Sequence, residues 1–366
     1  MTTLHRLLLP LALLTALPVA AQTLTVHFLD VGQGDAALIR TAEGKTVLID
    51  GGPPEAGKEL ARRVDALTSG PLDLMILSHP HLDHYGGLME VLERVGTKRY
   101  LEPGFEHNSP GYPELLSALQ LKGVEIRVSD RDTLNKNEPL EIDLGGGAKL
   151  TVLWPQRPLH PFLFDTRSDP NANSIVARLS YGDHSVLFTG DAEPETEAHF
   201  MRLGTDLRSD VLKVGHHGSR YSSTTPFLSR VRPKLAVISC GKNNPYRHPG
   251  PETLDRLKEA GAQIARTDLE GEIVVRLSSS GVTVQSSKQS QPTLVVPPIL
   301  AGGAKPGATP AAALRETQAY VASKRSKTFH SATCPAAAYI QKQNLVHFTT
   351  REAAAAAKRP AKDCNP

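Results

Sequence analysis

Cysteine, aromatic residues and long apolar runs are all scarce in this chain of 366 residues. Its three cysteines are too few for the disulfide framework of a small secreted domain, so a hydrophobic core must hold the fold. Cys240 ends an apolar stretch and is predicted to lie in that core. Beyond the N-terminus, no run approaches the ~20 consecutive apolar residues of a membrane helix. We therefore expect no membrane span after that segment.

The first 21 residues have the parts of a secretory signal peptide. Arg6 precedes a largely apolar run over residues 7–17, and small residues at 19–21 offer a cleavage site before Gln22. The alternative, a membrane anchor, needs a longer apolar run. The sequence thus predicts a periplasmic or secreted protein.

Charge is unevenly distributed along the chain. The formal net charge is only +3. Residues 315–366 nevertheless hold nine Lys and Arg against three Asp and Glu, whereas residues 22–285 are net acidic. A basic tail on an acidic body is explained equally by a solvated face and by contact with a polyanion.

Strands and helices alternate over residues 22–285, which predicts packed layers of sheet and helix. The predicted strands cover 24–28, 36–40, 46–50, 72–77, 150–154, 174–179, 185–189, 210–214, 235–239, 273–277 and 282–284, and the predicted helices cover 59–67, 114–121, 193–203 and 251–260. Residues 286–317 are rich in Ser, Gln, Pro, Gly and Ala and are predicted to form a flexible linker. Residues 318–366 regain a pattern and are predicted to be a small separate α+β module.

The strongest chemical signal directly follows the strand predicted over 72–77. Three imidazoles and a carboxylate stand within six residues there: His79, His81, Asp83 and His84. These side chains are borderline-soft ligands that suit zinc. Packed together without a metal, they would leave several buried polar atoms unpaired. A lone histidine is usually structural, but this cluster predicts a metal site.

The spacing resembles the His-x-His-x-Asp-His motif of the metallo-β-lactamase superfamily, and the resemblance extends over residues 24–285. It implies an α/β fold, a four-layer αββα sandwich, with two divalent metal ions, zinc or manganese. The segments that end at Asp50 and at Asp191 match two further motifs of that family. The resemblance implies that Asp50 supports a histidine ligand and that Asp191 bridges the two metals.

The resemblance also divides the ligands between the two metals: His79 and His81 for the first, and Asp83, His84 and His217 for the second. His216, directly before His217, is the alternative for the last position. The family's third-motif histidine has no clear counterpart. Asn173 stands about where it would fall, and His160 and His184 are candidates by residue type alone.

Several segments resemble the metallo-hydrolase domain that ends ComEC-type DNA-uptake proteins. They are the Asp-Val-Gly-Gln-Gly-Asp run at 30–35, the His-His-Gly-Ser run at 216–219, and segments 243–249 and 266–271. This resemblance implies a role in competence and DNA uptake, and an exported nuclease or other phosphodiesterase as the function. Phosphorylcholine esterases share the Asp-Val-Gly-Gln run, so a hydrolase of small esters, lactones or β-lactams is the alternative. A DNA-binding or envelope-binding protein with a vestigial metal site is a third interpretation.

The chemistry of such a site rests on a bridging hydroxide between two cations ~3.5–4 Å apart that clamp a phosphoryl oxygen. Asp83 and Asp191 are the predicted catalytic carboxylates. His248 is predicted to contact substrate or to protonate a leaving oxygen, or else to be a loop histidine bonded to local backbone. Further candidates are Ser219, Lys242 and Arg247 as phosphate binders and Asp30 and Asp35 as residues that orient ligands or organise a glycine-rich turn.

The C-terminal module resembles the small zinc-binding domain of Ada-type DNA repair proteins, which uses four cysteines in two pairs. The corresponding positions are His330, Cys334, Ala361 and Cys364. One ligand is missing, and a Cys334–Cys364 disulfide is preferred to a retained zinc. The thiolate used for methyl transfer is also absent, so repair activity is not implied. We expect the module to bind DNA or cell-envelope material.

Overall fold

The computed structural model describes residues 23–129, 139–156, 160–297, 320–324, 328–331, 345–348 and 350–360. The predicted signal peptide and the positions of Cys334, Ala361 and Cys364 lie outside the described residues. The described chain forms a nine-stranded, a seven-stranded and a four-stranded sheet. Among the described helices, none combines the length and the apolar character needed to cross a membrane.

The first sheet has the order β16-β15-β14-β1-β2-β3-β4-β5-β6. Its strands are β1 (Leu24–Phe28), β2 (Ala37–Arg40), β3 (Thr46–Ile49), β4 (Leu74–Ile76), β5 (Arg99–Glu102), β6 (Glu125–Val128), β14 (Ile273–Ser278), β15 (Gly281–Ser286) and β16 (Thr293–Val296). Strands β3 to β6 run parallel, and β1 pairs antiparallel with both β2 and β14. The beginning and the end of the domain therefore meet in one sheet.

The second sheet has the order β13-β12-β11-β10-β9-β8-β7. Its strands are β7 (Glu141–Gly145), β8 (Ala148–Trp154), β9 (Val176–Tyr181), β10 (His184–Phe188), β11 (Val211–Lys213), β12 (Leu235–Ile238) and β13 (Gln263–Arg266). Strands β10 to β13 run parallel, whereas β7 to β10 pair antiparallel.

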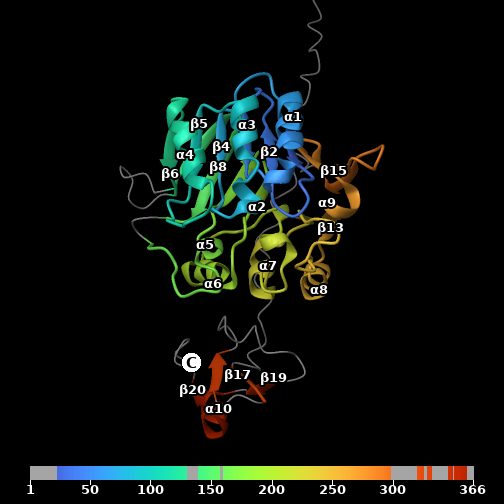
Figure 1. The fold of residues 1–366 in the computed structure, drawn as a ribbon. Helices are drawn as coiled ribbons and strands as arrows, with labels where there is room; N and C mark the ends of the chain where they lie inside the picture. The colour runs from blue at the N-terminus through green and yellow to red at the C-terminus, as the bar shows by residue number, and fades with distance from the viewer. Residues whose placement is uncertain are drawn as a thin grey trace, which may run out of the picture.

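Helices cover the outer face of each sheet. The longer ones are α1 (Gly57–Leu67), α3 (Leu88–Arg94), α4 (Tyr112–Leu121), α6 (Pro194–Leu203), α7 (Thr225–Val231) and α8 (Pro251–Glu259). Single turns occur at η1 (Pro54–Ala56), α2 (Leu82–Tyr85), α5 (Asp169–Ala172), η2 (Gly215–Gly218) and α9 (Thr267–Glu270). Figure 1 shows α1, α3 and α4 on one side of the sheets and α6, α7 and α8 on the other.

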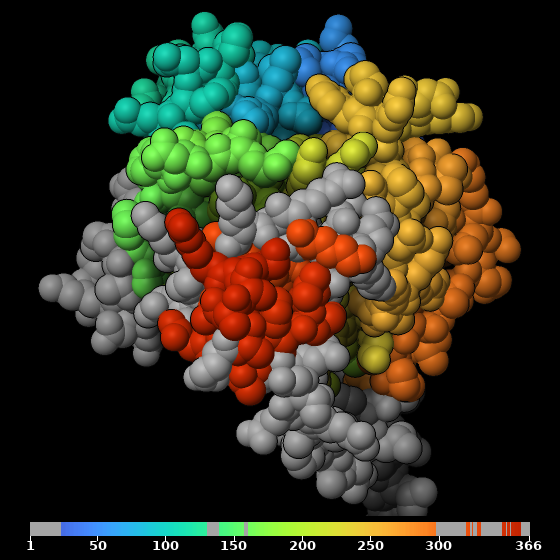
Figure 2. Space-filling view, turned by 90° about the horizontal axis from the view of Figure 1, so that it is seen from below, coloured from blue at the N-terminus to red at the C-terminus, as the bar shows by residue number. Residues whose placement is uncertain are grey.

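Three apolar clusters define the layers. One, with Phe28 and Val186, lies between the two sheets. A second packs the first sheet against α1, α3 and α4, and a third, with Trp154, packs the second sheet against α6, α7 and α8. The order helix, sheet, sheet, helix confirms the predicted α/β sandwich. Figure 2 shows the residues of the first half, in blue and cyan, and those of the second, in green to gold, as adjoining bands of one face.

The sequence dictates these elements through side-chain periodicity. Along β14 the residues alternate between buried and half-buried, so Ile273, Val275 and Leu277 face the core between the sheets. Helix α1 buries Leu60, Ala61 and Val64, which lie along one stripe at helical spacing.

The linker predicted from residue 286 is wrong at its beginning, because the first sheet continues through β16. This strand pairs antiparallel with β15, with Val296 opposite Val282. Val295 and Val296 pack against the core between the sheets. Two adjacent valines, β-branched and apolar, supply an edge strand although the flanking residues are typical of a linker.

The C-terminal module forms β17 (Tyr320–Ser323), β18 (Thr328–Ser331), β19 (Leu345–Phe348), α10 (Arg351–Ala357) and β20 (Arg359–Pro360). Thr350 caps α10, because its hydroxyl accepts a hydrogen bond from the Ala353 amide at 3.2 Å. Ala322, Phe329 and Ala354 form a small buried cluster between the sheet and the helix. The described elements are thus α+β in content.

Candidate metal centre

Each loop that carries a predicted metal ligand follows the C-terminal end of a strand. Residues 77–84 follow β4, Asp191 follows β10, and the turn η2 follows β11. These strands belong to the two different sheets, so the cluster lies where the two sheets meet at one edge. Open parallel sheets commonly place their sites at the carboxyl ends of strands.

Asp50 holds the first loop, residues 77–84, in place. Its carboxylate accepts hydrogen bonds from the Ser78 amide and the Ser78 hydroxyl, both at 2.7 Å, and lies 2.9 Å from His84 Nδ1. Burial raises the pKa of Asp50, while His84 acts in the opposite direction. With Nδ1 engaged, His84 presents Nε2 to the centre of the cluster.

Asp191 occupies that centre. Its Oδ1 lies 3.3 Å from His84 Nε2, and its Oδ2 lies 3.5 Å from His217 Nε2. The same Oδ2 is 3.7 Å from His216 Nε2 and 3.9 Å from His79 Nε2. Burial opposes its charge, but His217, His84 and His216 together hold its pKa well below the ordinary range. One carboxylate therefore faces four imidazoles.

The histidines on the second loop have an unusual backbone. His216 and His217 both have left-handed conformations, with φ of 49° and 52°. Only glycine adopts such angles freely, so two in succession indicate strain held by the surroundings. Gly218 follows at φ 82°, and a Cβ there would lie 2.6 Å from Pro249 Cβ. This turn directs both rings toward Asp191.

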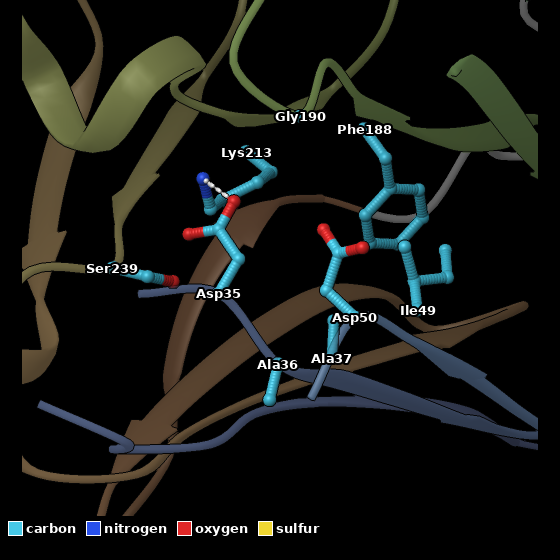
Figure 3. A pocket seen from close by; sticks show the side chains of 9 residues that line it. All are labelled: Asp35, Ala36, Ala37, Ile49, Asp50, Phe188, Gly190, Lys213 and Ser239. Atoms are coloured by element: carbon cyan, nitrogen blue, oxygen red, sulfur yellow. Dashed lines mark ion pairs between the residues drawn. The ribbon is translucent and has the colours of Figure 1, made fainter. Parts of the chain in front are cut away.

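Beneath the second loop, Asp35 and Lys213 form a buried ion pair with 2.6 Å between Oδ2 and Nζ. The other oxygen of Asp35 lies 3.1 Å from His217 Nδ1. Figure 3 shows the pair on the wall of a small cavity that Asp50 also lines. Burial opposes ionisation of Asp35, but Lys213 and His217 keep its pKa low.

Asp35 and Asp50 therefore each lie beside Nδ1 of a different histidine. Asp50 is the hydrogen-bond partner of His84 Nδ1, whereas His217 Nδ1 is hydrogen-bonded to the Ser239 carbonyl oxygen at 3.1 Å and faces Asp35, so that both rings turn Nε2 to the centre. Asp35 could itself be a metal ligand by distance, because one of its carboxylate oxygens and one ligand atom each of His84, Asp191 and His217 all lie within 4.8 Å of one another. Because Lys213 and His217 already engage its oxygens, Asp35 is better placed to orient His217.

His79 and His81 are the two remaining histidines of the first loop, and His79 faces the same Asp191 oxygen as His217. Their rings meet edge to face, with 3.0 Å between His79 Nε2 and His81 Nδ1. Burial, followed by the charge of His84, lowers the pKa of His79 well below its ordinary value. Burial also lowers the pKa of His81. Both rings therefore favour the neutral form that binds metals.

The residues fit a metal-bound state. Among the described side chains, His84 Nε2, His217 Nε2 and Asp191 Oδ1 are buried atoms without a hydrogen-bond partner. They converge on one point, although buried polar atoms are normally satisfied. Asp83 Oδ2 completes the set at 3.3 Å from His217 Nε2. The mixture of imidazole and carboxylate suits zinc, and manganese nearly as well.

His248 lies at the edge of this cluster. Its ring centre is 5.5 Å from that of His216 and 6.3 Å from that of His217. Asn244 fixes its backbone by a hydrogen bond in each direction. Burial, His216 and His217 lower the pKa of His248 to about 4, so the ring is neutral at pH 7.

Three other predicted residues make local hydrogen bonds. Asp30 is exposed and accepts a hydrogen bond from the Gly32 amide at 3.2 Å, which organises the glycine-rich turn. The Asn173 amide bonds to backbone at residues 163 and 169, and thereby anchors that loop. The Ser219 hydroxyl accepts from the Tyr221 amide at 3.5 Å.

The two histidines proposed by residue type for the third motif lie elsewhere. His184 Nδ1 is 3.3 Å from Asp210 Oδ2, at the opposite end of β10 from Asp191. The His160 ring packs against His199 at 5.2 Å. His216 instead faces the Asp191 oxygen Oδ2, as His79 and His217 do.

Sequence reasoning missed Lys213, Glu193 and His107. A lysine within the apolar run 211–214 is a signal, since a buried ammonium requires a partner. Glu193 lies 3.2 Å from His216 Nδ1, and the His107 ring packs 5.4 Å from that of His81. No local sequence pattern marks these last two.

Comparison with known proteins identifies relatives of this chain. Residues 29–242 match the profile of the Metallo-beta-lactamase superfamily. ComE operon protein 3 of Bacillus subtilis is 31% identical over 268 residues, which cover 69% of this chain and 33% of that protein. Recombination protein 2 of Haemophilus influenzae is 31% identical over 277 residues, covering 73% and 30%. Competence protein ComA of Neisseria gonorrhoeae is 30% identical over 261 residues, covering 70% and 33%. The chain thus spans about a third of the length of these relatives.

Proposed function

Because the chain belongs to the metallo-beta-lactamase superfamily, we propose that it is an exported, metal-dependent phosphodiesterase that cleaves DNA. The observation that carries this proposal is the placement of Asp191 among four imidazoles, with buried ligand atoms left unpaired around it. The names of the relatives, which refer to competence and recombination, support DNA as the substrate. A DNA-binding or envelope-binding role for residues 318–366 belongs to the same proposal.

The geometry suggests two sets of ligands that share Asp191. His79, His81 and His216 would form one set, and Asp83, His84 and His217 the other; the imidazoles of His79, His216 and His217 face Oδ2 of Asp191, and that of His84 faces Oδ1. His216 thereby takes the place that the third-motif histidine would fill. Two divalent cations held there would neutralise the charge of a phosphodiester and lower the pKa of water.

The chain's own residues prepare this site before any substrate arrives. Asp50 engages Nδ1 of His84, and the Ser239 carbonyl, with Asp35 beside it, engages Nδ1 of His217, which leaves Nε2 of both rings open toward the centre. Asp191 supplies negative charge midway between the two sets. His248, neutral at pH 7, is placed to exchange a hydrogen bond with a substrate oxygen at the edge of the cluster.

The test is hydrolysis by the full chain loaded separately with zinc and with manganese. Linear, plasmid and single-stranded DNA would be offered beside bis-p-nitrophenyl phosphate, p-nitrophenyl-phosphorylcholine and a β-lactam. We expect turnover of DNA and of the phosphodiester. In Asp191→Asn we expect both to fall by about three orders of magnitude, equivalent to ~4 kcal/mol of transition-state stabilisation.

Asp30→Asn is the matched control, because it makes the same change on an exposed turn outside the cluster. It should retain its activity. Turnover of phosphorylcholine or β-lactam alone would contradict the proposal and favour a small-ester hydrolase. DNA binding without any turnover by the metal-loaded chain would instead favour a binding protein.

A further inference from the structure

Large apolar side chains are exposed around the metal centre. Among the described residues, the exposed large hydrophobic side chains include three aromatic ones, Phe164, Tyr221 and Tyr246, at 64%, 42% and 65% exposure. A scattered aromatic residue on a surface needs no explanation. These three residues come from separate loops. Contacts link Tyr246 and Tyr221 to His216, and Phe164 packs against Phe105, which stands two residues before His107, a neighbour of His81.

Tyr246 reaches the cluster through His248. The two rings are stacked, with 5.7 Å between centres and 26° between planes. The His248 ring in turn lies 5.5 Å from that of His216. Lys242 and Arg247, on the same loop, are exposed. This loop therefore combines an open aromatic face with positive charge beside the predicted ligands.

Tyr221 reaches the cluster through Arg167. The guanidinium of Arg167 lies 3.5 Å from the centre of the Tyr221 ring, and its Nε is 3.8 Å from Glu193 Oε2. Glu193 Oε1 lies 3.2 Å from His216 Nδ1. The guanidinium covers one face of the Tyr221 ring, and a further ring can stack on the other face of the guanidinium.

Phe164 is the third exposed aromatic residue. It packs against Phe105 at 5.9 Å, and Phe105 also contacts Phe162 at 5.2 Å. Two residues after Phe105, the His107 ring lies 5.4 Å from that of His81. The acidic residues Glu106 and Asp165 are exposed on these loops, so positive charge is concentrated on the sides of Tyr221 and Tyr246.

We propose that Phe164, the Tyr221–Arg167 pair and Tyr246 form a rim that stacks unpaired nucleobases, so that the site takes single-stranded nucleic acid in preference to duplex. This inference rests on the proposed function and adds its substrate class. Stacked aromatic and guanidinium planes recognise the faces of bases, which a duplex keeps covered. The net acidic body cannot supply affinity through charge alone, which leaves stacking as the main attraction at this site.

The experiment measures binding without hydrolysis. The full chain, treated with chelator, is titrated against three fluorescent probes at physiological ionic strength: an oligothymidine of about 12 nucleotides, an abasic strand of equal length, and a duplex of equal length. The abasic strand carries the same phosphates without bases, so the basic C-terminal residues attract both strands equally. We expect the oligothymidine to bind most tightly.

Substitutions then assign the effect to the rim. Tyr246→Ala should raise the Kd for oligothymidine about 5- to 20-fold, because one base loses its stacking partner. The Kd for the abasic strand should stay within about two-fold, and Tyr246→Phe should bind like the unmodified chain, since it keeps the aromatic face. Leu121→Ala is the control for removal of an exposed apolar side chain, because Leu121 lies at the end of α4.

Equal affinity for oligothymidine and the abasic strand would overturn the proposal, as would an unchanged Kd in Tyr246→Ala. Failure of the proposed function is a separate outcome, because binding is measured on chelated protein and turnover on metal-loaded protein. Base-dependent binding without hydrolysis would keep the rim and reject the phosphodiesterase. Hydrolysis of bis-p-nitrophenyl phosphate without base-dependent binding would do the reverse.

Discussion

The two loops that meet at Asp191 place their histidines by different means. The first loop, residues 77–84, concentrates its ligand-type side chains in one contiguous run and is tied by Asp50 through Ser78 and His84. The second loop, η2, contributes His216 and His217 through a strained left-handed backbone. Its support comes from far along the chain, because Asp35 follows the first strand of the domain.

This difference indicates how each loop will respond to damage. The first loop depends on hydrogen bonds made to one carboxylate, that of Asp50, which follows the neighbouring strand β3. The second depends on a buried ion pair and on close packing of backbone against Pro249. Loss of support should therefore cost metal affinity at the first loop and folding free energy at the second.

The largest effect is expected from Lys213→Met. This change leaves the buried carboxylate of Asp35 without its cation, and breaking one side of a buried ion pair typically destabilises a fold by about 3–5 kcal/mol. Urea unfolding of the chelated chain measures the loss. Lys45→Met is the matched control, because Lys45 is half-exposed in its pair with Asp73 and should cost less than about 1 kcal/mol. Equal losses of unfolding free energy in the two variants would show that burial does not make the Asp35–Lys213 pair more stabilising than the half-exposed Lys45–Asp73 pair.

A smaller effect, on metal affinity, is expected from Asp50→Asn. The side-chain amide that replaces the carboxylate is uncharged and cannot accept hydrogen bonds from both Ser78 and His84 as the carboxylate does. The His84 ring therefore loses the contact that fixes its tautomer. Substitution of such supporting residues typically lowers metal affinity about 10- to 100-fold. Competition with a chromophoric chelator gives the affinity for zinc. Unchanged affinity would mean that backbone geometry alone orients the first loop.

The same difference explains what could be predicted from the sequence. The run His79 to His84 is visible because its members are neighbours, and spacing alone identifies it. The strand over Leu24–Phe28 was predicted with its observed bounds, because apolar side chains mark it throughout. β5 and β6 were missed, because Arg99–Glu102 and Glu125–Val128 place charged residues in short strands. The first of these strands lacks the alternation of apolar and polar residues that identifies a half-buried strand, and the second alternates but spans only four residues, most of them exposed.

Contacts between distant segments could not be predicted. The pairing of Asp35 with Lys213 joins two different sheets, and no local pattern relates them. The position of His216 beside Asp191 depends on positive φ at two consecutive non-glycine residues, which sequence statistics disfavour. Asn173 stands about where the third-motif histidine would fall, and in the structure its side-chain amide is hydrogen-bonded to the backbone of residues 163 and 169.

The smallest expected effect is a difference between two alanine variants, which separates conformation from packing at the second loop. Gly218 and Gly111 both have φ of 82°, but only at Gly218 would a Cβ meet a neighbour, at 2.6 Å from Pro249 Cβ. Alanine at either position pays the left-handed penalty of about 1–2 kcal/mol. Gly218→Ala should cost a further ~1–2 kcal/mol from overpacking, and should also weaken zinc binding because η2 must shift. Thermal unfolding with and without zinc measures both terms. If the two variants are equally stable and bind zinc equally, packing against Pro249 does not hold the second loop, and the ion pair beneath it must suffice.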